Sequence, residues 1–285
     1  MEALISAAVI FGSDNFVALR LIQKLKEQGI KVIDGDREEI PVNAAYIFDF
    51  KGNEAEWKKL ADNQKLVLVA ESEEEVVVWK NILEKTSLNW RIVKGENVYG
   101  EGMSEKGFLG QAFWLAAKNK NLILPSLEKV YRVLFVDDLV EAILRSCFLS
   151  GTAGKIFIIG GKETNSKLVA QVLLDEAKMT RTRVIQDTES GEESPENEEK
   201  KERMMRESQE LLRWQAETDF KDGAKETVSY FVARIDAENR RKTELKNNDF
   251  KVPKEEEKRE KRYEVEIEEE EKEENKENLK SKERE

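Results

Sequence analysis

Two residues near the amino terminus stand where a nucleotide could be bound. Gly12 follows the apolar run Ala7–Phe11, and Asp34 ends a second run that begins at Ile30. A glycine after a buried strand allows a tight turn into a helix, and a carboxylate at the end of the next strand can hydrogen-bond an adenosine ribose. Asp14 opposes that chemistry, because it brings negative charge to the helix start where a pyrophosphate would bind. The pattern also suits an ordinary strand–helix turn.

The elements that must position these residues are alternating strands and helices. Apolar residues recur at helical spacing between Gly12 and Gly29, and Gly29 can cap a helix in the left-handed conformation. Strand, turn, helix and strand in one short segment form a βαβ unit. Apolar runs at residues 45–48, 65–69, 90–93 and 155–159 predict further buried strands. The alternation predicts an α/β fold with a Rossmann-like, doubly wound, mostly parallel sheet.

The composition excludes several classes of site and partner. The chain has no histidine, which removes Ser-His-Asp triads, Cys-His pairs and histidine metal sites, so no metal is expected. The single Cys147 cannot form an intrachain disulfide, and its apolar helical neighbourhood favours core packing. The net charge of −11 argues against nucleic acid as a partner. Without a membrane-length apolar run or a signal-peptide pattern, the expected location is cytoplasmic.

Two segments in the second half carry a family resemblance. They are Asn97-Val98-Tyr99-Gly100-Glu101-Gly102 and the run Phe-Val-Asp-Asp-Leu-Val-Glu-Ala at 135–142. In this order and spacing they resemble the extended short-chain dehydrogenases/reductases, the NAD-dependent epimerase/dehydratase family of nucleotide-sugar enzymes. The resemblance spans residues 5–236. It implies a small C-terminal α/β substrate subdomain after the sheet, NAD or NADP as cofactor, and a nucleotide-sugar ligand.

The resemblance also implies cofactor-binding residues. The family's turn is Gly-x-x-Gly-x-x-Gly with a Phe-Ile pair inside it, and the aligned residues here include Gly12, Asn15, Phe16 and Val17. Only the first glycine is kept. Asparagine tolerates positive φ better than other non-glycine residues, so the turn can still form with Asn15. With Asp34, these four residues are the candidate cofactor contacts.

For the substrate, the resemblance implies contacts from Asn97, Tyr99 and Arg132. Asn97 and Tyr99 belong to the family's Asn-Val-Tyr-Gly-Pro-Gly loop, in which Glu101 replaces proline. Arg132 lies near the position of an arginine that grips the substrate diphosphate, although the register differs by about one residue.

The family's catalytic signature, a tyrosine followed four residues later by a lysine, is absent. No such lysine follows any of the five tyrosines, Tyr46, Tyr99, Tyr131, Tyr230 and Tyr263. Ser72 aligns with the family's catalytic Ser/Thr, but residues 73–75 after it are glutamates, whose charges oppose a phenolate. Lys80 is interpreted as a solvated helix lysine rather than a displaced catalytic one.

The chain is expected to hold one epimerase/dehydratase-like domain at 1–246 and a charged tail at 247–285. The acidic segment 186–203 predicts a flexible insertion in the domain. The tail is almost wholly charged and has too few apolar residues to offset the entropy of ordering, so it is expected to be disordered, with a solvated helix as the alternative. The helical segment 54–60 is too short for the long helices through which the family pairs its subunits. A monomer or weak dimer is therefore expected.

Three functions remain open from the sequence. The first is an NAD(P)-binding epimerase/dehydratase-like protein that is catalytically impaired because the Tyr-x-x-x-Lys pair is absent. The second is a non-catalytic interaction scaffold, whose acidic insertion or tail contacts a protein partner. The third is an active nucleotide-sugar epimerase/dehydratase with an unrecognised base.

Overall fold

The structure is a computed structural model that describes residues 7–61, 63–125, 130–178, 184–186 and 195–249. The chain divides into two units, Met1–Ala233 and Arg234–Glu285, so the division falls before the predicted boundary at residue 246. The last described element, α8 (Phe220–Asp249), begins in the first unit. Beyond residue 249, the segment predicted to be a disordered tail lies outside the described residues.

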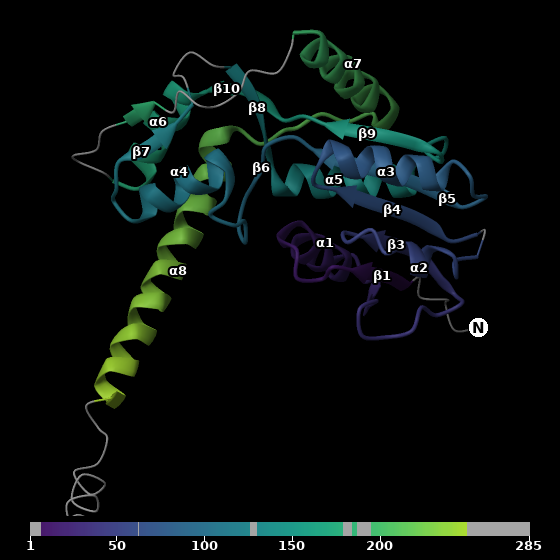
Figure 1. Ribbon diagram of the computed structural model, residues 1–285, viewed down its shortest axis with the longest axis horizontal. Helices are drawn as coiled ribbons and strands as arrows, with labels where there is room; N and C mark the ends of the chain where they lie inside the picture. Colours follow the sequence, from purple (N-terminus) through teal and green to yellow (C-terminus); the bar gives the residue numbers. More distant parts are fainter. Residues whose placement is uncertain (1–6, 62, 126–129, 179–183, 187–194, 250–285) are drawn as a thin grey trace, which may run out of the picture. The chain divides into compact units, whose positions relative to one another are not determined.

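A six-stranded parallel sheet forms the centre of the first unit (Figure 1). Its strands are β1 (Ala7–Phe11), β2 (Lys31–Asp34), β3 (Ala44–Asp49), β4 (Lys65–Ala70), β5 (Asn89–Gly95) and β9 (Lys155–Ile159). They lie in the order β2-β1-β3-β4-β5-β9, and every neighbouring pair is parallel. The strand order reverses between β1 and β3, and ligands of open parallel sheets bind in the crevice outside the carboxyl ends at such a point.

Helices cover both faces of this sheet, as the alternation of elements predicted. α1 (Phe16–Glu27) and α5 (Val136–Phe148) share one hydrophobic core with Ala8 and Ile10 of β1. α2 (Glu54–Trp57) and α3 (Glu73–Leu83) share the other core with Val9 and Phe11. Successive residues of β1 thus point to opposite faces, which is why its sequence is apolar throughout.

Smaller sheets and helices make up the C-terminal α/β subdomain. β6 (Val98–Tyr99), β8 (Val130–Phe135) and β10 (Lys162–Asn165) form one sheet in the order β10-β8-β6. β7 (Leu122–Leu124) and β11 (Val184–Gln186) form a parallel pair. α4 (Gly107–Ala117) and α6 (Ser166–Glu176) both pack against β7, and α4 also packs against α6. The fold class predicted from the sequence is therefore confirmed.

The prediction of a flexible insertion at 186–203 is wrong from Pro195 onward. Residues 187–194 lie outside the described residues, but α7 (Pro195–Leu212) is helical and packs against β9. Its buried residues Met205, Ser208 and Leu212 recur at helical spacing, and the Ser208 hydroxyl accepts the Ile158 N–H at 3.0 Å. The few apolar residues of this buried face are not apparent in a sequence dominated by charged residues. Glu and Lys are nevertheless good helix formers, so a highly charged segment can be a helix.

Two further observations bear on partners. Among the described helices, none is both long enough and apolar enough to cross a bilayer. α2 has only four residues, so it cannot be a long pairing helix. The expected monomer or weak dimer stays a prediction.

Cys147 is a fully buried residue of α5, and we expect its thiol to be inert in the folded protein. Burial raises the pKa of the Cys147 thiol to about 12, although Lys65 and Arg91 lower it in part. Since the thiolate is the reactive form, a disulfide reagent at about pH 8 should label native protein far more slowly than a free thiol. Protein unfolded in guanidinium is the control, and should release one thiol per chain. Rapid labelling of the native protein would contradict the burial.

Candidate functional site

The turn from β1 into α1 is built by Gly12 and Asn15. Gly12 has a φ of 76°, and a Cβ there would meet Phe50 Cβ at 3.0 Å. Asn15 has an extended backbone with φ −65°, and its side chain accepts the Val17 N–H at 2.9 Å, so it is the N-cap of α1. The expectation that Asn15 replaces a glycine by tolerating positive φ is therefore wrong. The turn needs left-handed backbone at Gly12 and a capping side chain at Asn15.

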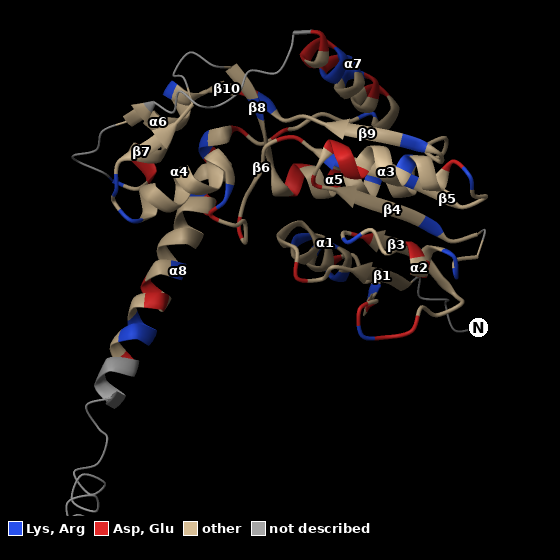
Figure 2. Ribbon diagram, in the orientation of Figure 1, with Lys and Arg blue, Asp and Glu red and all other residues tan. Residues whose placement is uncertain are grey.

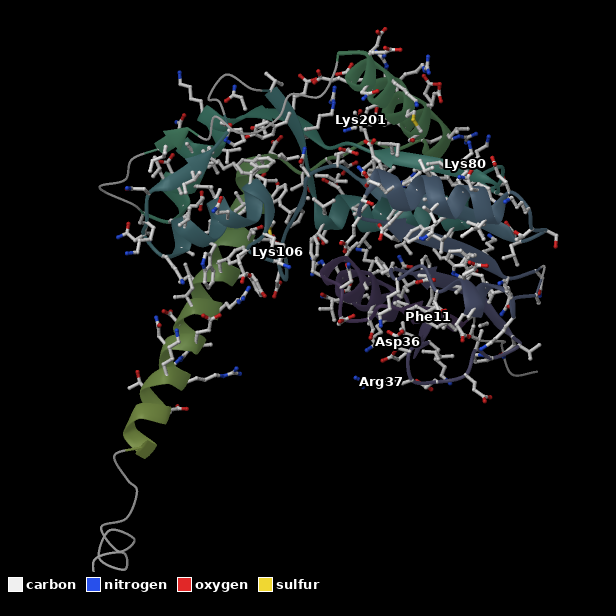
Figure 3. All side chains as sticks on the ribbon, viewed as in Figure 1. Phe11, Asp36, Arg37, Lys80, Lys106 and Lys201 are labelled. Atoms are coloured by element: carbon white, nitrogen blue, oxygen red, sulfur yellow. The ribbon has the colours of Figure 1, made fainter. Side chains whose placement is uncertain are left out.

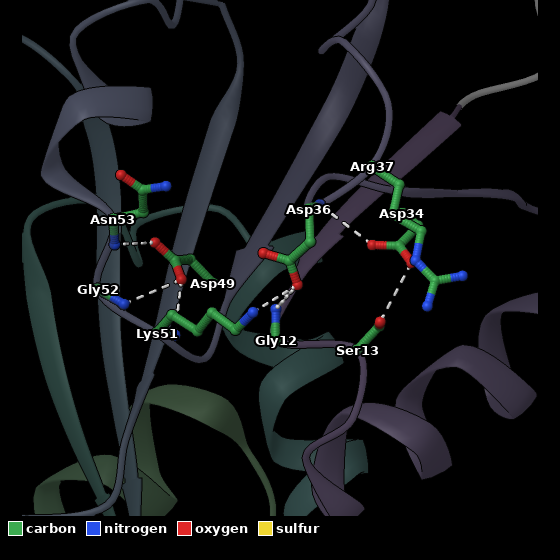
Figure 4. A network of polar contacts seen from close by, with 9 residues as sticks. All are labelled: Gly12, Ser13, Asp34, Asp36, Arg37, Asp49, Lys51, Gly52 and Asn53. Carbon is green, nitrogen blue, oxygen red and sulfur yellow. Dashed lines mark hydrogen bonds and ion pairs between the residues drawn. The ribbon is translucent and has the colours of Figure 1, made fainter.

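One carboxylate oxygen of Asp36 binds this turn and the strand beside it (Figure 4). Asp36 Oδ2 accepts the Gly12 N–H at 2.9 Å and the Lys51 ammonium at 2.8 Å. Burial alone would raise the pKa of Asp36, but the hydrogen bonds from Lys51 and Gly12 outweigh it, and the pKa lies below its usual value. Gly12 follows β1 and Lys51 follows β3, so donors from the ends of two neighbouring strands converge on one anionic oxygen.

Asp34 lies at the end of β2, where the sequence placed it. Its side chain accepts the Ser13 hydroxyl at 3.3 Å and the Asp36 N–H at 3.1 Å. The Arg37 guanidinium lies 3.4 Å from the Asp34 carboxylate and is largely exposed. Figure 3 shows Arg37 and Asp36 on the loop that follows β2. Asp34 therefore orders the loop that carries Asp36.

Asp49, a buried carboxylate that the sequence analysis missed, fixes the backbone that follows β3. Asp49 has no solvent exposure, and its Oδ1 accepts the N–H groups of Lys51 at 2.7 Å and Gly52 at 3.0 Å. Its Oδ2 accepts the Asn53 N–H at 2.8 Å and the Trp57 indole N–H at 2.7 Å. The backbone from which Lys51 projects is thus fixed by a fully satisfied charge.

Acidic groups dominate the carboxyl edge beside the turn. The Glu71 carboxylate accepts the Asn15 side-chain amide at 2.8 Å, and three glutamates open α3 (Figure 2). Ser72 is the N-cap of α3 in a capping box: its hydroxyl accepts the Glu75 N–H at 3.2 Å while the Glu75 carboxylate accepts the Ser72 N–H. Ser72, which aligns with the family's catalytic Ser/Thr, therefore acts locally as a helix cap. Lys80 is exposed and pairs with Glu84, as interpreted from the sequence.

A second charge cluster lies at the carboxyl end of β5. Lys94 is 6% exposed and pairs with Glu96. Lys201 of α7 lies 3.4 Å from both Glu96 and Glu73 (Figure 3), so these charges tie α7 to β5 and α3. The positive charges of Lys94 and Lys201 are thus paired with the negative charges of Glu73 and Glu96. Over the part of the chain that the structure describes, no group of acidic or cysteine side chains could hold a metal ion.

The loop that contains Asn97 and Tyr99 lies against Phe16, at the start of α1. A Cβ on Gly102, whose φ is 88°, would meet Phe16 Cβ at 3.0 Å. Asn97 donates from its amide to the Arg132 carbonyl at 2.7 Å, which ties the loop to β8. Tyr99 is 1% exposed and packs with aromatic rings of the core.

Arg132 is already paired within the protein. Its guanidinium lies 2.6 Å from the Glu163 carboxylate on β10 and 3.8 Å from Glu202 of α7. A substrate diphosphate would compete with these two carboxylates. The neighbouring Tyr131 makes a hydrogen bond of 3.1 Å between its hydroxyl and that of Ser166.

Comparison with known proteins places this geometry in a known fold. No protein-family model matches the sequence, and no curated protein is similar to it in sequence. Solved structures do match. RMD from Pseudomonas aeruginosa, complexed with NADPH, is 12% identical with a TM-score of 0.65, covering 82% of this chain and 100% of that one. WbmF from Bordetella bronchiseptica, in complex with NAD+, is 14% identical with a TM-score of 0.63, covering 82% and 94%. UDP-glucose 4-epimerase from Thermotoga maritima, with UDP-glucose, is 16% identical with a TM-score of 0.59, covering 80% and 99%.

The chain has the fold of the NAD-dependent epimerases and dehydratases. Identities this low show the fold alone. At the switch point between β1 and β3, Ser13 of the turn that Gly12 begins donates to Asp34, and the loop at 97–102 approaches Phe16 at the start of α1. The structure places Val17 in the core and pairs Arg132 elsewhere. Asp36 and Lys51, which the sequence analysis did not select, form an ion pair next to the turn at Gly12.

Proposed function

We propose that this protein is a catalytically impaired relative of the NAD-dependent epimerases/dehydratases that binds a nicotinamide dinucleotide at the crevice between β1 and β3. The observation that carries the proposal is the convergence of the Gly12 N–H and the Lys51 ammonium on one anionic oxygen, beside Asp34. These donors suit a phosphate oxygen as well as a carboxylate. Solved proteins of the same fold were determined with NAD+ and with NADPH.

The residues present fit the adenosine half of such a ligand. Asp34, at the end of β2, would hydrogen-bond the ribose hydroxyls, and Gly12 makes the tight turn between β1 and α1 with its positive φ. Lys51 would pair with a phosphate oxygen. The nearby charges of Asp14 and Glu71 weaken this binding, so we expect a modest affinity.

The chemical half of the site supports binding without turnover. When bound, a nicotinamide can accept or return a hydride, but a sugar hydroxyl must also lose a proton to a base. Ser72 is engaged as the cap of α3, and glutamates follow it where the family has its tyrosine and lysine. The proposed second ligand is a nucleotide-sugar, because UDP-glucose is bound in a solved structure of this fold.

NAD should bind about tenfold or more tightly than NADP. The 2′-phosphate of NADP would meet Asp34 and Asp36, and the Arg37 guanidinium that could receive it is already paired with Asp34. Isothermal titration calorimetry with both dinucleotides measures the ratio. Asp34→Asn, which removes one of the two charges, should narrow it.

Equal or tighter binding of NADP would contradict the preference. If neither dinucleotide binds the wild-type protein or any variant of the crevice, the binding proposal fails and the interaction scaffold becomes the better account.

A further inference from the structure

We propose that the hydrogen-bonded side chains of Asn15 and Glu71 occupy the place of the pyrophosphate in this fold, and that they must separate before NAD binds. This rests on the proposed function and names the contact that limits its affinity. In dinucleotide-binding folds the pyrophosphate lies at the amino terminus of the first helix, where the second glycine of the turn lets the backbone approach it. Here that second position is Asn15, the N-cap of α1.

The Asn15 side chain uses a donor that a pyrophosphate would need. Its Oδ1 accepts the N–H of Val17, the second residue of α1, at 2.9 Å. The first backbone N–H groups of a helix have no partner within the helix, so they are the groups that bind an anion at this end. A glycine at the second position would leave the Val17 N–H open to a phosphate oxygen, whereas the asparagine satisfies it from within the protein.

Glu71 holds the other end of the Asn15 amide and brings negative charge to it. The Glu71 carboxylate accepts a hydrogen bond from Asn15 Nδ2 at 2.8 Å. Glu71 directly follows β4, and β3 lies between β4 and β1, so this hydrogen bond spans the carboxyl edge of the sheet across β3. A dinucleotide bound at the switch point between β1 and β3 would run along the same edge. Its phosphates would therefore meet a carboxylate where binding needs donors.

The contact can open without unfolding the protein. The Glu71 N–H donates to Glu75 Oε2 at 2.7 Å, and the same oxygen accepts the Ser72 N–H at 3.2 Å, so the start of α3 fixes the Glu71 backbone. The hydrogen bond between the Asn15 and Glu71 side chains is itself exposed, so both groups can turn to water. Opening is thus a rotation of two side chains, and its cost is subtracted from the affinity for NAD.

The test is to measure the NAD affinity of full-length variants by calorimetry, with thermal unfolding to show that each variant folds. Asn15→Gly opens the helix end and should bind NAD about tenfold or more tightly than wild type. Glycine is accepted at an N-cap, and it adopts the φ of −65° and ψ of 138° found at Asn15, so this variant should remain folded. Glu71→Ala leaves the Asn15 amide free to donate to a phosphate, so it should also bind NAD more tightly.

Two further variants separate this contact from helix capping and from net charge. Asn15→Asp keeps a good N-cap but puts a carboxylate in the place of the amide, so it should bind NAD about tenfold or more weakly than wild type. Glu74→Gln removes one charge from the first turn of α3 and leaves the Asn15–Glu71 contact in place. Its affinity for NAD should stay within about twofold of wild type, because water and salt screen exposed charges.

The wild-type affinity distinguishes failure of this proposal from failure of the proposed function. If wild type binds NAD and a folded Asn15→Gly protein binds it no more tightly, the contact is no obstacle and this proposal alone is rejected. A gain in Glu74→Gln as large as in Glu71→Ala would also reject it, because net charge would then explain both. Binding by Asn15→Gly but not by wild type would support the proposal and show that the contact closes the site. Absence of NAD binding in wild type and in every variant would reject both.

Discussion

Supplied with NAD and a UDP- or dTDP-sugar, the purified protein should turn over far more slowly than the roughly 1 s⁻¹ at which ordinary enzymes begin. A general base alone contributes about 10²–10⁴-fold, and the missing lysine would also weaken cofactor positioning. The deficit should appear with epimerisation and dehydration in the presence of NAD and with reduction in the presence of NADH, because in each reaction a protein group must exchange a proton with the sugar oxygen when hydride moves.

Three of the described tyrosines, Tyr46, Tyr99 and Tyr131, do not suit the role of a substitute base. Burial, reinforced by Asp138 and other acids, raises the pKa of Tyr99, whereas a tyrosinate base needs a lowered one. Burial also raises the pKa of Tyr131 despite its hydrogen bond with Ser166. Tyr46 lies on β3 opposite Lys65, which is at the amino end of β4, and its ring packs on Phe148. It is therefore away from the carboxyl ends of the strands. Tyr263 lies outside the described residues.

The assay needs an active reference and a variant that separates roles. UDP-glucose 4-epimerase from Thermotoga maritima, a solved protein of this fold, is the reference under the same conditions. Ser72→Ala should leave any residual rate unchanged while lowering stability by about 1 kcal/mol through loss of the helix cap. Turnover near 1 s⁻¹ in the wild type, or its loss in Ser72→Ala, would reject catalytic impairment and indicate an unrecognised base.

The strands could be predicted from the sequence because their chemistry is local. Ala7–Phe11 is apolar throughout, which suits a strand buried on both faces, and β1 does lie between β2 and β3. Asp34 could be placed for the same reason, since it ends such a strand. The order of strands and helices in the βαβ pattern, with a right-handed crossover, determines which strand ends lie on either side of the switch point.

The occupants of the crevice could not be predicted, because their roles depend on contacts between segments far apart in sequence. Lys51 reaches Asp36 across the crevice, and Asp36 reaches Gly12 over 24 residues. The Asp34-Gly35-Asp36 spacing was a visible signal, but it does not say which carboxylate meets the turn. Asn15 was misjudged because a glycine position was assumed to need positive φ, whereas the side chain instead caps α1.

Replacing Asp49 by alanine should lower the free energy of unfolding by about 3 kcal/mol or more. Asp49 is fully buried, and its removal leaves four donors, three backbone N–H groups and the Trp57 indole, without their acceptor. Asp49→Asn should also destabilise the protein, because an amide nitrogen on either side of the group would face donors rather than accept from them. Urea unfolding with a shared m-value measures both losses.

The exposed Asp14→Asn is the control for lost charge, and its stability should lie within about 0.5 kcal/mol of wild type. A loss below about 1 kcal/mol in Asp49→Ala would mean that water replaces the carboxylate and that the burial is not rigid. The same variant should weaken NAD binding even where it remains folded, because Asp49 holds the N–H of Lys51 at 2.7 Å and so fixes the backbone from which the lysine crosses Gly12. Unchanged NAD affinity in a folded Asp49→Ala protein would show that the backbone fixed by Asp49 does not contribute to NAD binding.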